Sequence, residues 1–145
     1  MRIVTKRGDD GQTSTGDFRR VSKASDEIEF LGEIDELQSF LGILPKTDEI
    51  KEIQRDLYKI MANEDVTAQR LDLYISELTI PDIKHFVLPD GWFHVVRSVC
   101  RRAERAAVRI DHPSMKYLNR LSDYLYILNF PVSYTHLTLP TIYSV

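Results

Sequence analysis

The amino-acid sequence predicts an all-α protein: a bundle of five helices that follows an irregular segment, residues 1–24. Three observations support this prediction. Apolar residues recur at spacings of three and four through most of the chain, the spacing of one helix face. No stretch makes a convincing sheet. Hydrophobic residues make up 43% and charged residues 28%, which is typical of a globular domain, and 145 residues suffice for one compact domain.

Composition narrows the classes of function. The net charge of −3 gives no reason to expect a nucleic-acid partner. The single cysteine, Cys100, excludes an intramolecular disulfide framework and fits a reducing compartment. We find no apolar run of the ~20 residues that a membrane span needs, and no secretory signal. We therefore expect a cytoplasmic protein without a membrane partner.

The first predicted helix follows a segment rich in Gly, Asp, Thr, Ser and Arg, residues 1–22, which reads as loop or short extended structure. Ser25 is the expected N-cap, with Asp26 and Glu27 favourably placed in the first turn. Pro45 is expected to end the helix. Its apolar face comprises Ile28, Leu31, Ile34, Leu37, Leu41 and Leu44.

Two further helices are expected between Thr47 and Pro81. One follows Thr47 and carries an apolar stripe of Ile50, Ile53, Leu57 and Ile60. The next is shorter, stops before Pro81, and carries Leu71, Tyr74, Ile75 and Leu78.

A turn-containing loop, residues 86–92, separates these from the last two helices, because it contains Pro89 and the pair Asp90-Gly91. The fourth helix is expected to be buried through Val95, Val96, Val99, Ala103, Ala106, Ala107 and Ile110. The fifth is expected to begin at Pro113, a suitable first-turn residue. Its buried positions are Leu118, Leu121, Leu125 and Leu128.

Residues 131–145 do not continue this pattern. They have no helical stripe and are bracketed by Pro131 and Pro140. We interpret them as an atypical tail, a frameshift or vector-derived segment, with a native edge strand as the alternative. The domain is therefore expected to span residues 1–130, with residues 25–130 as the helical bundle.

The amino-terminal motif, residues 5–14, has the chemistry of a polyphosphate cradle. Gly8 and Gly11 allow tight turns that bring backbone N–H groups against an anion. Hydroxyl groups come from Thr5, Thr13 and Ser14, and positive charge from Lys6 and Arg7. It is not a Walker P-loop, because the Gly-x-x-x-x-Gly-Lys-Ser/Thr pattern is absent. The alternative is a polar turn around Asp10-Gly11.

A second motif lies in the fourth helix, where Arg97, Arg101 and Glu104 share one face and Arg102 and Arg105 flank it. Arginine forms charge-assisted, sometimes bidentate contacts with phosphate, which would suit a triphosphate. The alternative is a solvated helix face with weak Glu–Arg pairs.

Two polar positions on other helices add to this. Asn119 and Asp123, four residues apart, face away from the leucine stripe of the fifth helix, and Asn119 could contact phosphate or a metal-bound water. Its alternative is a simple inter-helix hydrogen bond. Asp35 lies opposite the apolar stripe of the first helix, toward a partner surface or solvent.

Together these residues resemble the PduO-type ATP:cob(I)alamin adenosyltransferases. The resemblance runs from Thr5 to about Leu128, most of the chain outside the tail. Its segments are residues 5–14, 20–23, 31–37, 86–89, 101–105 and 119–124. It implies a helical bundle of the ferritin-like type that assembles as a homotrimer, with ATP at the subunit interfaces.

The resemblance also implies roles for residues. One subunit would bind ATP through Thr5, Lys6, Arg7, Gly8, Asp9, Gly11, Thr13, Ser14 and Lys23. The neighbouring subunit would close over the phosphates with Arg101, Arg102, Glu104, Arg105 and Asn119. Asp35 and Arg97 match an inter-subunit salt bridge. Mg²⁺ would be bound by the ATP phosphates, near Glu104 and Asn119, without a dedicated set of protein ligands.

The implied reaction is transfer of the 5′-deoxyadenosyl group of ATP to Co(I) of cobalamin. Since Co(I) is itself the nucleophile, the protein would position the reactants and stabilise the tripolyphosphate leaving group, with Lys23, Arg101, Asn119 and Mg²⁺ as the candidates for that stabilisation. Phe86 matches an aromatic residue that covers the lower face of the corrin; the alternative is ordinary core packing. A flavoprotein or another reductase would supply the reduced cobalt.

Departures from the family pattern, together with the atypical tail, motivate an alternative function. Asp90 and Trp92 stand where the family has a glycine and a small residue, and the stretch from Ala62 to Leu78 is short. The alternative is an ATP-binding helical trimer that has lost corrin catalysis and serves as a binding or regulatory module.

Overall fold

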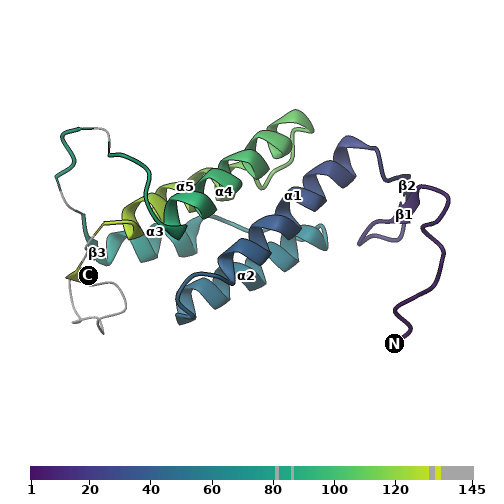
Figure 1. The fold of residues 1–145 in the computed structure, drawn as a ribbon, viewed down its shortest axis with the longest axis horizontal. Helices are drawn as coiled ribbons and strands as arrows, with labels where there is room; N and C mark the ends of the chain where they lie inside the picture. The colour runs from purple at the N-terminus through teal and green to yellow at the C-terminus, as the bar shows by residue number, and fades with distance from the viewer. Residues whose placement is uncertain (81, 86, 131–132, 135–145) are drawn as a thin grey trace.

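The structure, a computed structural model, describes residues 1–80, 82–85, 87–130 and 133–134. Within these residues the chain forms five helices and two small antiparallel sheets (Figure 1). The elements are β1 (Gln12–Ser14), β2 (Arg20–Ser22), α1 (Asp26–Leu41), α2 (Asp48–Met61), α3 (Gln69–Ser76), β3 (Leu78–Thr79), α4 (Trp92–Arg109), α5 (Met115–Leu128) and β4 (Ser133–Tyr134). The prediction of an all-α bundle is confirmed.

Helices α1 and α2 begin where the sequence predicts. The Ser25 hydroxyl accepts a 3.2 Å hydrogen bond from the N–H of Ile28, and the Thr47 hydroxyl accepts one of the same length from Ile50. Both caps satisfy an amide that the first turn leaves unpaired. Helix α1 ends at Leu41, before Pro45 is reached. Gly42 is a weak helix former, and the residue before a proline is biased away from the helical region, so the last turn does not form.

Helix α3 is shorter than predicted. It ends at Ser76, and Leu78 lies in strand β3, where its side chain is still buried with 6% exposure. Strand β3 pairs antiparallel with β4, with Leu78 opposite Tyr134 and Thr79 opposite Ser133. Strand β4 lies within the predicted tail; the other tail residues, 131–132 and 135–145, are outside the described residues.

Two predictions for the last helices are wrong in detail. Helix α5 begins at Met115, because Pro113 lies in the turn between α4 and α5. Val95 was expected in the core, but its side chain is 40% exposed. The neighbouring Val96 is fully buried, and consecutive helical residues point about 100° apart, so one faces the core and the other faces out.

The core lies between α1, α2, α4 and α5, and α3 packs against α5. Its largest fully buried side chains are Tyr117, Tyr124, Phe30, Ile34, Leu37, Leu41, Ile53, Leu57, Ile60, Leu71, Leu118 and Leu121. Burial of this apolar surface is the main favourable contribution to folding. Among the described residues, no helix is both long and apolar enough to cross a membrane.

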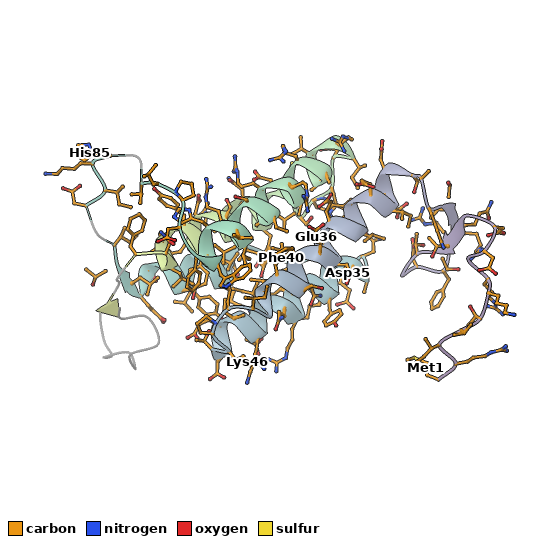
Figure 2. All side chains as sticks on the ribbon, viewed as in Figure 1. Met1, Asp35, Glu36, Phe40, Lys46 and His85 are labelled. Atoms are coloured by element: carbon orange, nitrogen blue, oxygen red, sulfur yellow. The ribbon has the colours of Figure 1, made fainter. Side chains whose placement is uncertain are left out.

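The bundle leaves two irregular regions at its opposite ends. The β1–β2 hairpin lies past the amino-terminal end of α1, and the loop before α4 lies at the far end of the molecule with β3 (Figure 1). In Figure 2 the labelled Met1 and His85 mark these two ends. The sequence motifs are therefore distributed along the whole length of the molecule.

Candidate functional site

The amino-terminal motif is folded into a compact loop by contacts with strand β2 and the residues after it. Lys23 Nζ donates a 3.0 Å hydrogen bond to the carbonyl of Gly8, and its backbone N–H donates one of 2.8 Å to Gly11. A Cβ at Gly8 would lie 2.7 Å from Lys23 Nζ, so a larger residue there would displace the lysine from this contact. Gly11 has φ +81°, which also favours glycine.

Arg20 is a second anchor of this loop, and the sequence prediction did not include it in the site. Its guanidinium donates to the Arg7 carbonyl at 3.1 Å and to the Ser14 hydroxyl at 3.3 Å, and it lies 3.7 Å from Asp10. Ser14 and Arg20 are opposite each other in the β1–β2 ladder. The sequence predicts no hairpin for residues 1–22, so the position of Arg20 across from the motif becomes apparent only in the β1–β2 pairing.

These contacts turn most of the predicted ATP-binding side chains toward solvent. Of that set, Gly8 and Thr13 are half-buried, and the others are exposed: Thr5, Lys6, Arg7, Asp9, Gly11, Ser14 and Lys23. The Thr5 hydroxyl accepts a long hydrogen bond, 3.4 Å, from the N–H of Arg7. The loop thus presents cationic and hydroxyl groups on a fixed backbone.

The second cluster joins α4 to α5. Arg101 Nη1 lies 2.9 Å from Glu104 Oε2 and donates to Asn119 Oδ1 at 3.5 Å, the upper limit of a hydrogen bond. The Arg101 side chain is 44% exposed and that of Glu104 only 17%. Glu104 therefore holds the guanidinium beside Asn119 while leaving donor N–H groups open to an incoming anion. The structure brings these three predicted residues together.

The two flanking arginines differ from each other. Arg102 is bound to α1, with Nε 2.7 Å from Glu33 Oε2 and a second ion pair to Glu36. The hydrogen bond to Glu33, followed by that to Glu36, raises the pKa of Arg102. Arg105 is exposed and lines a cavity of about 300 Å³ between α1 and α4, with Glu29, Glu33, Arg102, Ala106 and Arg109.

Asp35 and Arg97 do not pair within the described part of this single chain. Asp35 is exposed on α1, where Figure 2 labels it. The Arg97 guanidinium carbon lies 5.3 Å from the ring centre of Tyr126, a cation–π contact that holds it against α5. Asp35 is therefore open to solvent, whereas Arg97 is half-buried beside Tyr126.

The loop before α4 exposes an apolar surface. Phe86 is outside the described residues. Val87, Leu88 and Trp92 are exposed by 41%, 87% and 54%. A cavity of about 170 Å³ lies beside the first turn of α4, lined by Pro89, Asp90, Gly91, His94, Val95 and Ser98. Gly91 caps the helix with φ +82°, a conformation that favours glycine.

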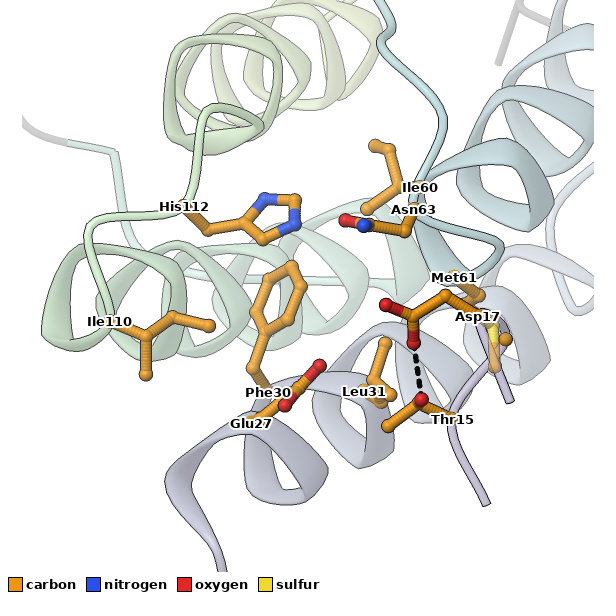
Figure 3. Close-up of a pocket in the computed structure, with 11 residues that line it drawn as sticks. Thr15, Asp17, Glu27, Phe30, Leu31, Ile60, Met61, Asn63, Ile110 and His112 are labelled. Atoms are coloured by element: carbon orange, nitrogen blue, oxygen red, sulfur yellow. Dashed lines mark hydrogen bonds between the residues drawn. The ribbon is translucent and has the colours of Figure 1, made fainter. Parts of the chain in front are cut away.

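A further cavity, of about 240 Å³, lies where the hairpin meets the bundle (Figure 3). His112 covers one side and stacks on Phe30, with ring centres 4.5 Å apart. Burial lowers the pKa of His112. Its Nδ1 accepts a 3.1 Å hydrogen bond from the N–H of Ser114, which places the proton of the neutral ring on Nε2. Sequence reasoning missed this cavity, because its walls come from four separate segments.

One copy of the chain does not unite the two clusters of predicted ATP-binding residues. The hairpin lies beyond the bundle at the amino-terminal end of α1, whereas Arg101 and Asn119 lie within α4 and α5 (Figure 1). No group of three or more His, Cys, Asp or Glu side chains within the described ranges could hold a metal ion. Within one chain the two clusters of predicted site residues are therefore separate.

Comparisons with known proteins show similarity to one enzyme family. Residues 3–132 match the family described as Cobalamin adenosyltransferase. A cobalamin adenosyltransferase of Cupriavidus metallidurans is 33% identical, with 88% of this chain and 85% of the relative covered. A corrinoid adenosyltransferase of Bacillus subtilis is 32% identical over 87% of this chain and 83% of its own.

A solved structure is also similar. A variant PduO-type ATP:corrinoid adenosyltransferase from Lactobacillus reuteri, complexed with cobalamin and ATP, superimposes with a TM-score of 0.74 and 26% identity. The superposition covers 87% of this chain and 90% of the other.

Proposed function

The chain belongs to the cobalamin adenosyltransferase family, and from that premise we propose that it transfers the 5′-deoxyadenosyl group of ATP to cob(I)alamin. The doubly occupied orbital of Co(I) attacks C5′ of the ribose. The cobalt–carbon bond forms as the C5′–O bond breaks, and tripolyphosphate leaves with the electron pair of that bond. Cobalt changes formally from Co(I) to Co(III), because its electron pair becomes the new bond to C5′. No external oxidant is therefore needed.

The observation that best supports this proposal is the juxtaposition of Arg101, Glu104 and Asn119 from two helices. Negative charge develops on the leaving phosphate, and preorganised donors lower the energy of that state. Arg101 supplies the charged donor and Asn119 the amide, while Glu104 fixes the guanidinium. Arg105 lies one helical turn away and adds positive charge. Arg102 would have to leave Glu33 and Glu36 to join them.

We place the nucleotide between subunits of a homotrimer. The amino-terminal loop, with Lys23 at its base, would hold the phosphates from one subunit, and the Arg101 cluster would close from the next. The separation of the two clusters in one chain supports this arrangement. Asp35 of one subunit and Arg97 of its neighbour would form the salt bridge at the interface.

Mg²⁺ fits as a companion of ATP rather than a resident metal. Glu104 is paired with Arg101, and Asn119 accepts from the same guanidinium, so neither is a free ligand. When bound, Mg²⁺ would neutralise part of the triphosphate charge. The arginines and Lys23 would neutralise the remaining negative charge.

Corrin would dock against the apolar loop before α4, with Phe86 beneath the ring. Val87, Leu88 and Trp92 provide exposed apolar surface there. We expect the reduced cobalt to come from a flavoprotein or another reductase in the cytoplasm, a compartment where Cys100 stays a thiol.

An anaerobic spectroscopic assay tests the proposal. The purified protein is mixed with chemically reduced cobalamin, Mg²⁺ and ATP. We expect conversion of the Co(I) spectrum to that of adenosylcobalamin, dependent on ATP and on the protein. ATP binding without conversion would overturn the proposal in favour of a binding or regulatory module.

A further inference from the structure

The turn that joins β1 to β2, residues 15–19, is closed by its own polar groups. The N–H of Thr15 donates to the Arg19 carbonyl at 2.9 Å, and the N–H of Phe18 donates to the Thr15 carbonyl at 2.9 Å. The Thr15 side chain is buried; its hydroxyl accepts from the Arg19 N–H at 3.1 Å and donates to the Asp17 carboxylate. The turn therefore behaves as one rigid unit.

Arg19 connects this unit to the first helix. Its Nε lies 2.8 Å from Asp17 Oδ2, within the turn. Its two terminal nitrogens contact both carboxylate oxygens of Glu27 on α1, at 2.5 and 3.3 Å. This bidentate geometry fixes direction as well as distance. The hydrogen bond from Arg19, followed by that from Thr15, lowers the pKa of Asp17, so this carboxylate stays charged at neutral pH.

Among the described residues, the Arg19–Glu27 pair provides the side-chain hydrogen bonds between the hairpin and a helix. The other anchor is steric: a Cβ at Gly16 would lie 3.0 Å from the Met61 carbonyl, so the turn rests on the end of α2. On its opposite side, only residues 23–25 link β2 to α1. Without Arg19, the hairpin could rotate about this short linker.

We infer that Arg19 is a positioning residue for nucleotide binding. Together with Glu27 it sets the angle of the hairpin on α1, and so the direction in which residues 5–14 face the neighbouring subunit. This inference rests on the proposed function, in which that loop holds the triphosphate. An exposed ion pair contributes little to the stability of the fold. We therefore expect its loss to weaken ATP binding while the fold stays stable.

The experiment compares Arg19→Ala, Glu27→Ala and the double variant with Glu29→Ala. Glu29 lies in the same first turn of α1 and carries the same charge, but among the described residues it forms no ion pair or hydrogen bond with the hairpin. KM for ATP and kcat are measured in the anaerobic assay. ATP affinity is measured by calorimetry on the purified protein without cobalamin. Tm is measured by thermal unfolding.

We expect KM and Kd for ATP to rise about three- to tenfold in each single variant. The kcat and Tm should change little, and Glu29→Ala should match the wild type. The double variant should be no worse than either single one, because both remove the same contact. Arg19→Lys should restore part of the affinity through its remaining charge.

Three results would overturn the inference: unchanged ATP affinity in both single variants, losses that add in the double variant, or a fall in Tm that accounts for the weaker binding. Failure of the proposed function is a different outcome. There the wild-type protein makes no adenosylcobalamin, while the calorimetric comparison still decides the role of Arg19. A wild-type protein that binds no ATP would overturn both.

Discussion

The Tyr117 hydroxyl on α5 donates a 2.9 Å hydrogen bond to Oδ2 of Asp56 on α2, inside the bundle. The two residues are exposed by only 1% and 2%. Arg70 Nε lies 3.3 Å from the same oxygen and balances its charge. Burial, reinforced by the neighbouring Asp56 carboxylate, raises the pKa of Tyr117, so it remains a donor at any physiological pH.

Replacing Tyr117 with Phe should therefore destabilise the fold. The change leaves a buried carboxylate with one donor fewer, and hydrogen bonds to charged groups contribute about 1.5–3 kcal/mol. We expect the free energy of unfolding, measured by urea denaturation, to fall by that amount while kcat stays unchanged. Tyr58→Phe is the matched control, because Tyr58 lies on the same bundle and is 66% exposed. Equal stability of the two variants would contradict the prediction.

This contact shows which parts of the fold the sequence can predict. The stripe of Ile53, Leu57 and Ile60 identifies the buried face of α2 from spacing alone, and the structure confirms it. Asp56 lies on that face, but an acid there is unexpected until its partners are known. Tyr117 is 61 residues away in sequence, and such a pairing depends on how the helices pack.

The site shows the same limit. The spacing of Arg101 and Glu104 predicts a shared helix face, and the structure adds Asn119 from α5. Arg102 is the next residue after Arg101, but it lies on the side of α4 that faces α1, where it pairs with Glu33. Arg19 acts through Glu27 across a turn whose conformation no local pattern defines. Residues that act through tertiary contacts are therefore the ones that sequence reasoning omits.

Arg101→Ala should slow adenosylation strongly and leave the fold intact. The side chain is 44% exposed, so its removal creates no cavity in the core. Loss of one charged donor to the leaving group should lower kcat by about 10²–10³-fold. Single-turnover conversion of cob(I)alamin measures the rate, and circular dichroism checks the fold. Arg109→Ala, on the same helix and also exposed, should retain activity. Near-normal turnover of the Arg101 variant would refute its role.

Phe86→Ala should affect the two starting oxidation states of cobalt differently. An apolar ring beneath the corrin offers no lone pair to cobalt and excludes water, which makes Co(II) easier to reduce. We expect a larger loss of rate from Co(II) with a reductant than from pre-reduced Co(I). Leu73→Ala, which removes an exposed apolar side chain from α3, serves as the control. Equal losses from both starting states would show that Phe86 only packs.

Phe18→Gly should stabilise the hairpin. Phe18 has φ +65°, and its side chain is 92% exposed, so the ring gains little from packing. A non-glycine residue with this left-handed backbone conformation costs about 1–2 kcal/mol. Glycine removes that cost but loses more conformational entropy when the chain folds. The expected gain is therefore up to about 1 kcal/mol, measured as slower hydrogen exchange of β1 and β2 amides. Phe18→Ala keeps the strained backbone and should gain less. A Gly variant no better than Ala would show that the turn is unstrained.

His112 should make stability depend on pH. Burial lowers its pKa in the folded protein from the ordinary value of 6.5, an effect that Glu27 and Asp65 partly offset. The unfolded state then binds the proton more tightly. Stability is complete above about pH 6.5 and declines as the pH falls from there toward the folded pKa. In His112→Gln this decline should be smaller when unfolding is measured between pH 5 and 7.5, a range set about the ordinary histidine pKa. His85→Gln, at an exposed site, should keep the wild-type profile. If the two variants have the same pH profile, the cavity beside the hairpin is not the origin of the dependence.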